Sequence, residues 1–168
     1  MQLPSRFAFV LPCVLLSVLA LAAPPGPTQQ IPAARWVIAP DRITDTRTAL
    51  LWSAADNGAD IDWNAARGFC DARGAGWRLP SVDEIRSLYT DPADTDAHLS
   101  CGAAQCSSGA PLRLSGAWFW SAAAVGKDAY DGDELAWGVS LASGGRTQSV
   151  KDQSYGSRAL CVRDGAAH

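Results

Sequence analysis

Residues 77–85 read Trp-Arg-Leu-Pro-Ser-Val-Asp-Glu-Ile, and this stretch decides the fold of the chain. Ser81 followed three residues later by Glu84 predicts a capping box, in which each residue's side chain accepts from the other's backbone N–H. Pro80 stands just before the cap, where it favours extended backbone in the preceding residue and cannot prolong an earlier helix. The stretch therefore predicts an extended segment that turns into a helix over residues 82–89.

A second helix is predicted just upstream of this stretch. Asp62 is a good N-cap, and Trp63, Ala66 and Cys70 recur at helical spacing, which predicts a helix over residues 63–73. The same spacing places the cysteine on the inner face of that helix, so we expect it to reach the core.

The rest of the folded chain reads as short strands and loops. In the stretch 135–142, Leu135, Trp137, Val139 and Leu141 alternate with small residues and predict a strand with one buried face. The remaining predicted elements are strands over 36–38, 117–122, 146–150 and 159–162, a hairpin over 41–52, and a long loop over 90–111. Strands at both ends with two helices between them predict an α+β domain, with the helices packed on a small, mostly antiparallel twisted sheet.

The amino-terminal residues are predicted to lie outside this domain. Arg6, the apolar run 7–19 and the small residues around Leu21 are typical of a secretory signal, so we expect residues 1–22 to be removed after Ala22. The apolar run is short for a membrane span. Residues 23–34 are proline-rich and predict a stiff linker, which leaves 35–165 as one domain. We therefore expect a periplasmic or extracellular protein that is not an integral membrane protein.

The charge balance narrows the possible partners. The chain has 17 Asp and Glu against 14 Lys and Arg, one of which belongs to the expected signal. Nucleic-acid binding relies on neutralising phosphates with Lys and Arg, so this acidic balance argues against a nucleic-acid partner. It also weakens the case for a sulfated polyanion as ligand.

The cysteines indicate two disulfides. Four of the five lie outside the expected signal, and four cysteines in an exported chain allow three pairings. Cys101 and Cys106 are close together in a loop rich in Gly, Ser and Ala, so we pair them with each other. Cys70 then bridges to Cys161 and ties the first helix to the last strand. The chain has no Cys-x-x-Cys pair outside the signal, which argues against a zinc site.

Several stretches resemble a known family. They are residues 43–52, 63–70, 77–81 with 84–85, 119–121 with 136–137, and 158–163. In order and spacing these stretches are similar to the C-terminal domain of the Lcl collagen-like bacterial adhesins, a family of mostly unknown function. The resemblance implies a C-type-lectin-like fold, adhesion or another surface interaction, and the Cys70–Cys161 bridge. Ala49 departs from the family pattern, because a Gly is usual there.

Calcium has one weak candidate site in the sequence, and otherwise no cofactor is expected. C-type lectins that bind sugar through calcium resemble one another in a Glu-Pro-Asn or Gln-Pro-Asp loop and a Trp-Asn-Asp strand, and none of these tripeptides occurs here. The densest group of carboxylates could offer the oxygen ligands that calcium prefers; it consists of Asp128, Asp131, Asp133 and Glu134. The alternative is an ordinary solvated acidic loop.

Catalysis has one candidate group. His98 near Asp94 and Asp96 could act as a general base with an orienting acid, and the alternative is an exposed histidine in a polar loop. The chain has no Gly-x-Ser-x-Gly nucleophile motif. We therefore expect the protein not to be an enzyme.

Ligand-binding residues are expected on the loops beside the late strands. Trp118 and Tyr130 border these loops and could form an aromatic surface that stacks on sugar rings or anchors a protein. The other candidate binding residues are Asp131, Asp133, Arg146, Lys151 and Arg158. The remaining patterned tryptophans are expected in the core; they are Trp63, Trp77, Trp120 and Trp137.

The sequence thus predicts an exported, non-enzymatic binding or adhesion module that recognises a glycan or a cell-envelope protein. Two alternatives stay open. One is a small secreted hydrolase that uses His98 with loop carboxylates, and the other is a purely structural envelope protein.

Overall fold

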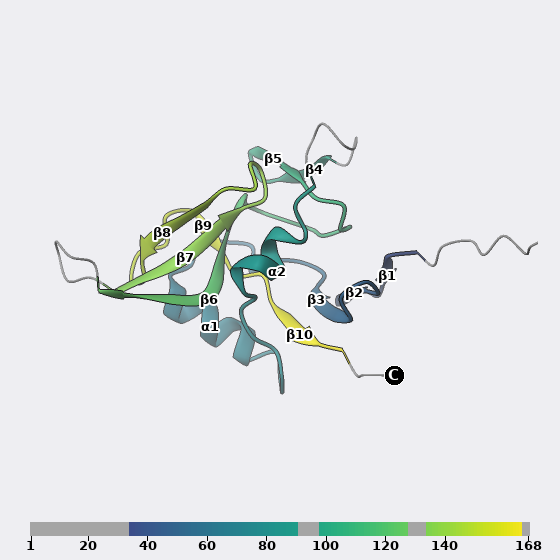
Figure 1. Ribbon diagram of the computed structural model, residues 1–168, viewed down its shortest axis with the longest axis horizontal. Helices are drawn as coiled ribbons and strands as arrows, with labels where there is room; N and C mark the ends of the chain where they lie inside the picture. Colours follow the sequence, from purple (N-terminus) through teal and green to yellow (C-terminus); the bar gives the residue numbers. More distant parts are fainter. Residues whose placement is uncertain (1–33, 91–97, 128–133, 166–168) are drawn as a thin grey trace, which may run out of the picture. The chain divides into compact units, whose positions relative to one another are not determined.

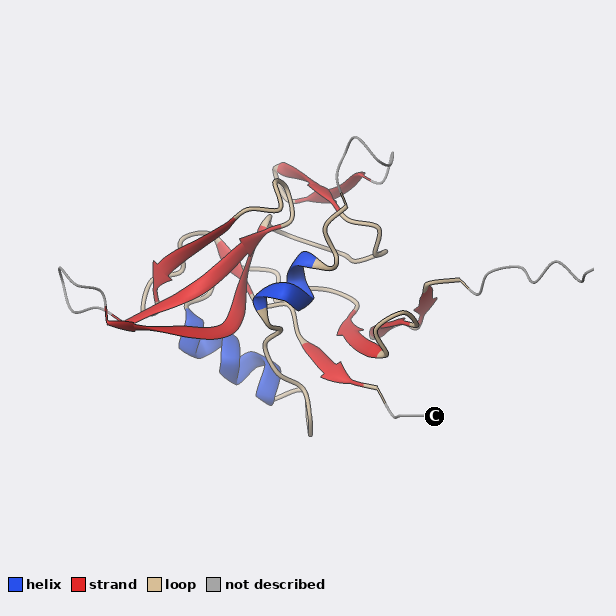
Figure 2. Ribbon diagram, viewed as in Figure 1, coloured by secondary structure: helices blue, strands red, loops and turns tan. Residues whose placement is uncertain are grey.

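A computed structural model describes residues 34–90, 98–127 and 134–165 (Figures 1 and 2). Within these residues the chain forms two helices, two four-stranded sheets and one two-stranded sheet, an α+β arrangement. None of the helices in this part of the chain is long and apolar enough to cross a membrane. The expected signal peptide and residues 23–33 of the expected linker lie outside the described residues.

The first sheet joins the two ends of the domain. Its strand order is β1-β2-β3-β10, and its bounds are Trp36–Ile38, Arg42–Asp45, Leu50–Ser53 and Val162–Asp164. All of its pairs are antiparallel, so the predicted hairpin over 41–52 is confirmed. The last strand of the domain therefore completes the sheet that the first strands begin.

Asp45 fixes the turn of this hairpin. Its carboxylate accepts from the Arg47 N–H at 3.0 Å and from the Arg35 guanidinium at 2.8 Å. Burial acts to raise the pKa of Asp45, but the hydrogen bonds from Arg35 and from the Arg47 N–H outweigh it, so that this pKa lies below its ordinary value. The buried carboxylate is therefore held in its charged form, paired with Arg35.

The second large sheet has the strand order β8-β7-β6-β9. Its bounds are β6 Trp118–Lys127, β7 Glu134–Ser140, β8 Arg146–Val150 and β9 Ser157–Arg158, and β9 pairs with β6 in parallel. Phe119 and Trp120 are both fully buried and belong to two different core clusters, on the two faces of the sheet. The predicted strand over 117–122 is confirmed as β6, an inner strand of this sheet, although it runs beyond residue 122.

The prediction of one small sheet is wrong, and so is the single strand over 159–162. The segment from Ala159 to Cys161 leaves the second sheet after β9 and enters the first sheet at β10 (Figure 1). Residues 159–161 belong to no strand, and of the predicted strand only Val162 lies in β10. At this crossing Ser53 donates its N–H to the Cys161 carbonyl at 2.8 Å, and the Ser53 hydroxyl accepts from the Cys161 N–H at 3.0 Å.

The crossing segment is also tied to the first helix. Helix α1 runs over Trp63–Asp71, and its Cys70 forms a disulfide with Cys161, as predicted. Trp63, Ala66 and Cys70 are its buried residues, which confirms the predicted helical face. The helix stops two residues earlier than predicted.

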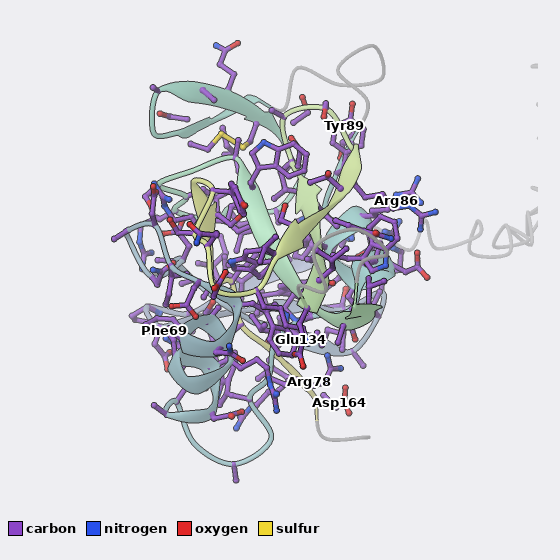
Figure 3. All side chains as sticks on the ribbon, turned by 90° about the vertical axis from the view of Figure 1, so that its left-hand side faces the viewer. Phe69, Arg78, Arg86, Tyr89, Glu134 and Asp164 are labelled. Atoms are coloured by element: carbon purple, nitrogen blue, oxygen red, sulfur yellow. A yellow bond between two sulfur atoms is a disulfide. The ribbon has the colours of Figure 1, made fainter. Side chains whose placement is uncertain are left out.

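Helix α2, Val82–Arg86, is short and strongly capped. Both hydrogen bonds of the predicted Ser81–Glu84 capping box are present. The Arg78 guanidinium also donates to the Glu84 carboxylate at 2.8 Å, and Figure 3 shows Arg78 beside Asp164, to which it donates at 3.2 Å. The hydrogen bond from Arg78 lowers the pKa of Glu84, and the same bond raises the pKa of Arg78. The helix ends three residues before the predicted boundary.

The predicted long loop over 90–111 contains a small hairpin. Strands β4, His98–Cys101, and β5, Ala104–Ser107, pair across Gly102 and Ala103. Gly102 has φ of +68°, as a two-residue hairpin turn with glycine first requires. A Cβ at Gly102 would collide with the Ser115 carbonyl oxygen, so the turn packs closely on that backbone. The predicted disulfide between Cys101 and Cys106 lies within this hairpin and is confirmed.

The prediction of a single buried face on β7 is wrong. Ala136 is buried in one core cluster and Val139 in the other, because the sheet is covered on both faces. Trp137, expected in the core, is half-buried. Trp77, also expected there, is half-buried at the margin of its cluster. Trp63 and Trp120 are buried as predicted.

Candidate functional site

The turn between β8 and β9 holds an aromatic side chain in an unusual backbone conformation. We call residues 154–157 the Tyr155 turn. The Ser157 N–H donates to the Ser154 carbonyl at 2.7 Å, and φ is +46° at Tyr155 and +73° at Gly156. Positive φ at both central residues with this hydrogen bond is the pattern of a type I′ turn, whose central positions favour Gly, Asn and Asp.

Tyrosine is therefore an unfavourable residue type at this position of the turn. A bulky residue at positive φ is an outlier that usually reflects strain. In the part of the chain that the structure describes, the other non-glycine residue with positive φ is Ala49, which is small. Tyr155 is 58% exposed, so packing in the core does not offset this strain. Strained residues of this kind cluster at functional sites.

A pocket of about 250 Å³ lies at the start of the same loop. We call it the Lys151 pocket, and it is lined by Asn64, Glu134, Val150, Lys151 and Asp152. The residues come from the start of α1, the start of β7 and the end of β8. In Figure 1 the start of β7 and the end of β8 lie at the same end of the sheet, and Glu134 is labelled in Figure 3.

Lys151 is fixed from several sides. Its ammonium group donates to the Glu134 carboxylate at 2.8 Å and lies 4.6 Å from the centre of the Trp63 ring. Its backbone N–H donates to the Glu134 carbonyl at 2.9 Å, which continues the β7–β8 ladder by one pair. With a side chain only 12% exposed, Lys151 presents an ordered donor rather than a mobile one.

The first turn of α1 contributes Asn64 to the lining of the pocket. The Asp62 side chain caps this helix by accepting from the Ala65 N–H at 2.9 Å. Trp63 donates its N–H to the Lys151 carbonyl at 2.9 Å and its ring N–H to the Ser121 carbonyl at 2.8 Å. These bonds tie helix, sheet and loop together, so the lining of the pocket is formed in advance of any ligand.

Arg158 stabilises the end of the β8–β9 loop that leads into β9. Its guanidinium donates to Asp60, to the Ser115 hydroxyl at 2.9 Å and to the Gly156 carbonyl at 3.1 Å. The side chain is only 13% exposed. The structure thus places this predicted binding residue beneath the Tyr155 turn, where it supports the turn rather than facing a ligand.

Arg146 and Trp118 lie elsewhere. The Arg146 guanidinium stacks 4.8 Å from the centre of the Trp137 ring. Trp118 is half-buried and lies against Gly138. Arg146 pairs with Val139 and Trp118 pairs with Ser140, and neighbouring positions on a strand face opposite ways, so the two side chains are on opposite faces of the sheet. They cannot share one binding surface with each other.

The acidic loop and the catalytic alternative fall largely outside the described residues. The predicted site residues that lie outside the described part of the chain are Tyr130, Asp128, Asp131, Asp133, Asp94 and Asp96, together with the side chain of His98. Glu134, the described member of the predicted calcium group, pairs with Lys151. Among the described residues, no three His, Cys, Asp or Glu side chains gather in a way that could hold a metal ion.

Of the predicted binding residues, the structure therefore brings Lys151 to a pocket and Arg158 under the adjoining turn. Tyr155, Asn64 and Asp152 were not among the predicted binding residues. Ser154 and Gly156 around Tyr155 are a recognisable turn signal, but the sign of φ at the tyrosine depends on the turn type. Asn64 and Asp152 come from segments far apart in the sequence and meet only in the folded domain.

The chemistry of the site is that of hydrogen bonding. Lys151 and the Asn64 amide are donors, Glu134 and Asp152 are acceptors, and the amide can also accept. The charges are mixed in sign. Such a set matches a ligand rich in hydroxyl groups, which can donate and accept, better than a strongly charged one.

The sequence matches a known protein family. The family model described as the Lcl C-terminal domain matches residues 41–163. No curated protein matches the chain.

Proposed function

Because this chain belongs to the Lcl C-terminal domain family, we propose that it is an exported, non-enzymatic binding module that holds a glycan at the Tyr155 turn and the Lys151 pocket. The observation that carries the proposal is the exposed tyrosine at positive φ in the same loop as Lys151 and Asp152, which line a polar pocket. An aromatic ring has a flat apolar face with a polar tip, which suits the apolar face and the hydroxyl groups of a sugar.

The size of the pocket supports one sugar unit as the inserted group. Its volume of about 250 Å³ is just below the ~300–1,000 Å³ typical of sites for drug-sized ligands. A single ring in the pocket leaves the next unit of a chain free to lie on Tyr155. Binding through one ring and one aromatic contact is weak for each site, as is usual for modules that act by many contacts at a surface.

Export and fold form part of the same proposal. Two disulfides are typical of proteins in an oxidising compartment, which supports a periplasmic or extracellular location. The family resemblance together with the α+β arrangement supports a C-type-lectin-like fold. The absence of the calcium-lectin tripeptides from the sequence supports a site that works without calcium.

The test is a glycan array followed by titration calorimetry of the best ligand. We expect Tyr155→Asn and Lys151→Met each to weaken binding by about tenfold or more, since central contacts carry most of the binding energy. Tyr155→Phe keeps the ring and is expected to keep most of the affinity. Arg42→Ala, an exposed change on the first sheet, is the matched control and should leave binding unchanged.

Three outcomes would contradict the proposal. A blank array together with capture of an envelope protein that Tyr155→Asn abolishes would mean that this site binds protein instead. Turnover of a bound glycan that His98→Ala abolishes would favour the hydrolase alternative. Binding that is unaffected by both Tyr155→Asn and Lys151→Met would place the glycan site elsewhere.

A further inference from the structure

Strand β1 presents an apolar edge that no other described strand pairs with. Val37 is 56% exposed and Ile38 is 65% exposed. Within the described residues, the other large hydrophobic side chain that is exposed is Tyr155, which the proposed glycan site uses. In these residues β1 pairs with β2 on one side and with no strand on the other, so it is an edge of its sheet.

The hydrogen bonds to β2 show which backbone groups face outward. The Thr46 N–H donates to the Arg35 carbonyl, and the Ala39 N–H donates to the Arg42 carbonyl. Hydrogen-bonded pairs alternate along an antiparallel ladder, so Val37 with Thr44 is also such a pair. The N–H and carbonyl groups of Trp36 and Ile38 therefore point away from β2 and are free to pair with another strand.

The far edge of the same sheet, β10, and the β8 edge of the second sheet are protected against pairing. On β8 the exposed side chains include Arg146 and Gln148, and polar or charged side chains discourage edge pairing. On β10 the backbone of Arg78 covers the outer side, because Arg78 and Val162 exchange two hydrogen bonds of 2.9 Å. β1 has neither a charged residue within the strand nor a covering segment among these residues.

The edge is also held rigid. Trp36 packs against the main core cluster, and Arg35 lies 4.1 Å from the centre of its ring. The Arg35 guanidinium donates to Asp45 and to the Ser87 carbonyl at 3.1 Å. A strand ordered before it binds loses little further conformational freedom on pairing, which favours association.

The chain's own upstream segment is a poor partner for this edge. Residues 23–33 contain four prolines, at positions 24, 25, 27 and 32, and proline has no N–H to donate to a ladder. A second copy of β1 has no such defect. We propose that β1 is a homodimer interface, in which the β1 strands of two copies pair antiparallel about a two-fold axis at Val37.

The outward groups select this register. Trp36 of each copy exchanges both of its hydrogen bonds with Ile38 of the other copy, and the two Val37 residues face each other as a non-hydrogen-bonded pair. The same residue cannot bond inward and outward at once, and in this register none has to. Arg35 faces Ala39 of the other copy, so no charge meets a like charge across the axis. The result is one continuous sheet through both domains.

Cysteine cross-linking of the full chain tests this register. Cα atoms of a non-hydrogen-bonded pair are about 4.5 Å apart, within the range that a disulfide spans. Val37→Cys should therefore form covalent dimers under mild oxidation at least ~10 times faster than Thr147→Cys, an exposed change on the β8 edge. Peptide mapping should show the two native disulfides intact in both variants.

Sedimentation of the unmodified chain gives the second measurement. We expect a reversible dimer. Ile38→Lys should raise the dissociation constant of this dimer by about tenfold or more, since charged side chains oppose edge pairing. Circular dichroism checks that this exposed change leaves the fold intact. A chain that stays monomeric at millimolar concentration would overturn the proposal, and so would Val37→Cys cross-linking no faster than Thr147→Cys. Because Tyr155→Asn should leave dimerisation unchanged, this test is independent of glycan binding.

Discussion

Replacing Tyr155 by Asn should make the domain more stable while it weakens binding at the proposed site. A left-handed conformation costs an ordinary L residue roughly 1–2 kcal/mol, and Asn tolerates it far better. The Tyr155 side chain is 58% exposed, so its loss removes little buried apolar area. We therefore expect the free energy of unfolding to rise by about 1 kcal/mol, or the melting temperature by about 3–5 °C for a domain of this size.

Reversible thermal unfolding followed by circular dichroism, with urea unfolding as a second method, measures this change. Tyr155→Phe keeps both the strain and the ring, and should leave stability unchanged. Ala49→Gly is the matched backbone control, because Ala49 also has positive φ, at +57°. Ala49→Gly should raise the free energy of unfolding by less, at most about 1 kcal/mol, since glycine loses more conformational freedom on folding.

The reasoning would be refuted by a fall in melting temperature in Tyr155→Asn. Such a fall would mean that the ring packs on the domain and that its conformation serves stability. A rise in stability together with lost glycan binding is the combination that distinguishes a residue held in place for a ligand.

Three further predictions concern stability. Replacing both Cys70 and Cys161 by Ser should lower the free energy of unfolding by about 4–5 kcal/mol in the chain-entropy model, as guanidinium unfolding can measure. The pKa values of Asp45 and Glu84 in the folded protein lie below their ordinary values of 3.8 and 4.5. The two charged carboxylates therefore contribute their full stability at a pH above these ordinary values, and that stability is lost as the pH falls through the lower pKa values of the folded protein. Melting temperature should therefore drop steeply below about pH 4.5, and less steeply in Glu84→Gln. Gly102→Ala should lower the free energy of unfolding by about 2 kcal/mol or more, from positive φ together with the collision at the facing carbonyl, again measured by guanidinium unfolding.

The features that could be predicted from the sequence are those set by neighbouring residues. Ser81 and Glu84 are three residues apart, and each finds its partner within one helical turn. The face of α1 follows from the spacing of Trp63 and Cys70 alone. The Cys70–Cys161 bridge followed because Cys101 and Cys106 are close enough in sequence to leave no other choice once they are paired.

The features that could not be predicted depend on how distant segments meet. A run such as Ala159–Cys161 is apolar whether it lies within one sheet or passes between two. On β7, alternation predicts one buried face only where the other face meets water, and here Trp63 and Trp120 pack with Ala136 on that second face. The site was missed for the same reason, because three separate segments form the Lys151 pocket.

The first sheet is finished only when β10 takes its place beside β3, and both helices and the whole second sheet lie between these two strands in the sequence. The hairpin of β2 and β3 can form early, because its strands are neighbours in the chain. Its outer neighbour has to be brought back over a long loop, and the entropy of closing such a loop is lost before the new contacts repay it. We therefore expect the β2–β3 hairpin to form first and the docking of β10 to be a late step in the folding of this domain.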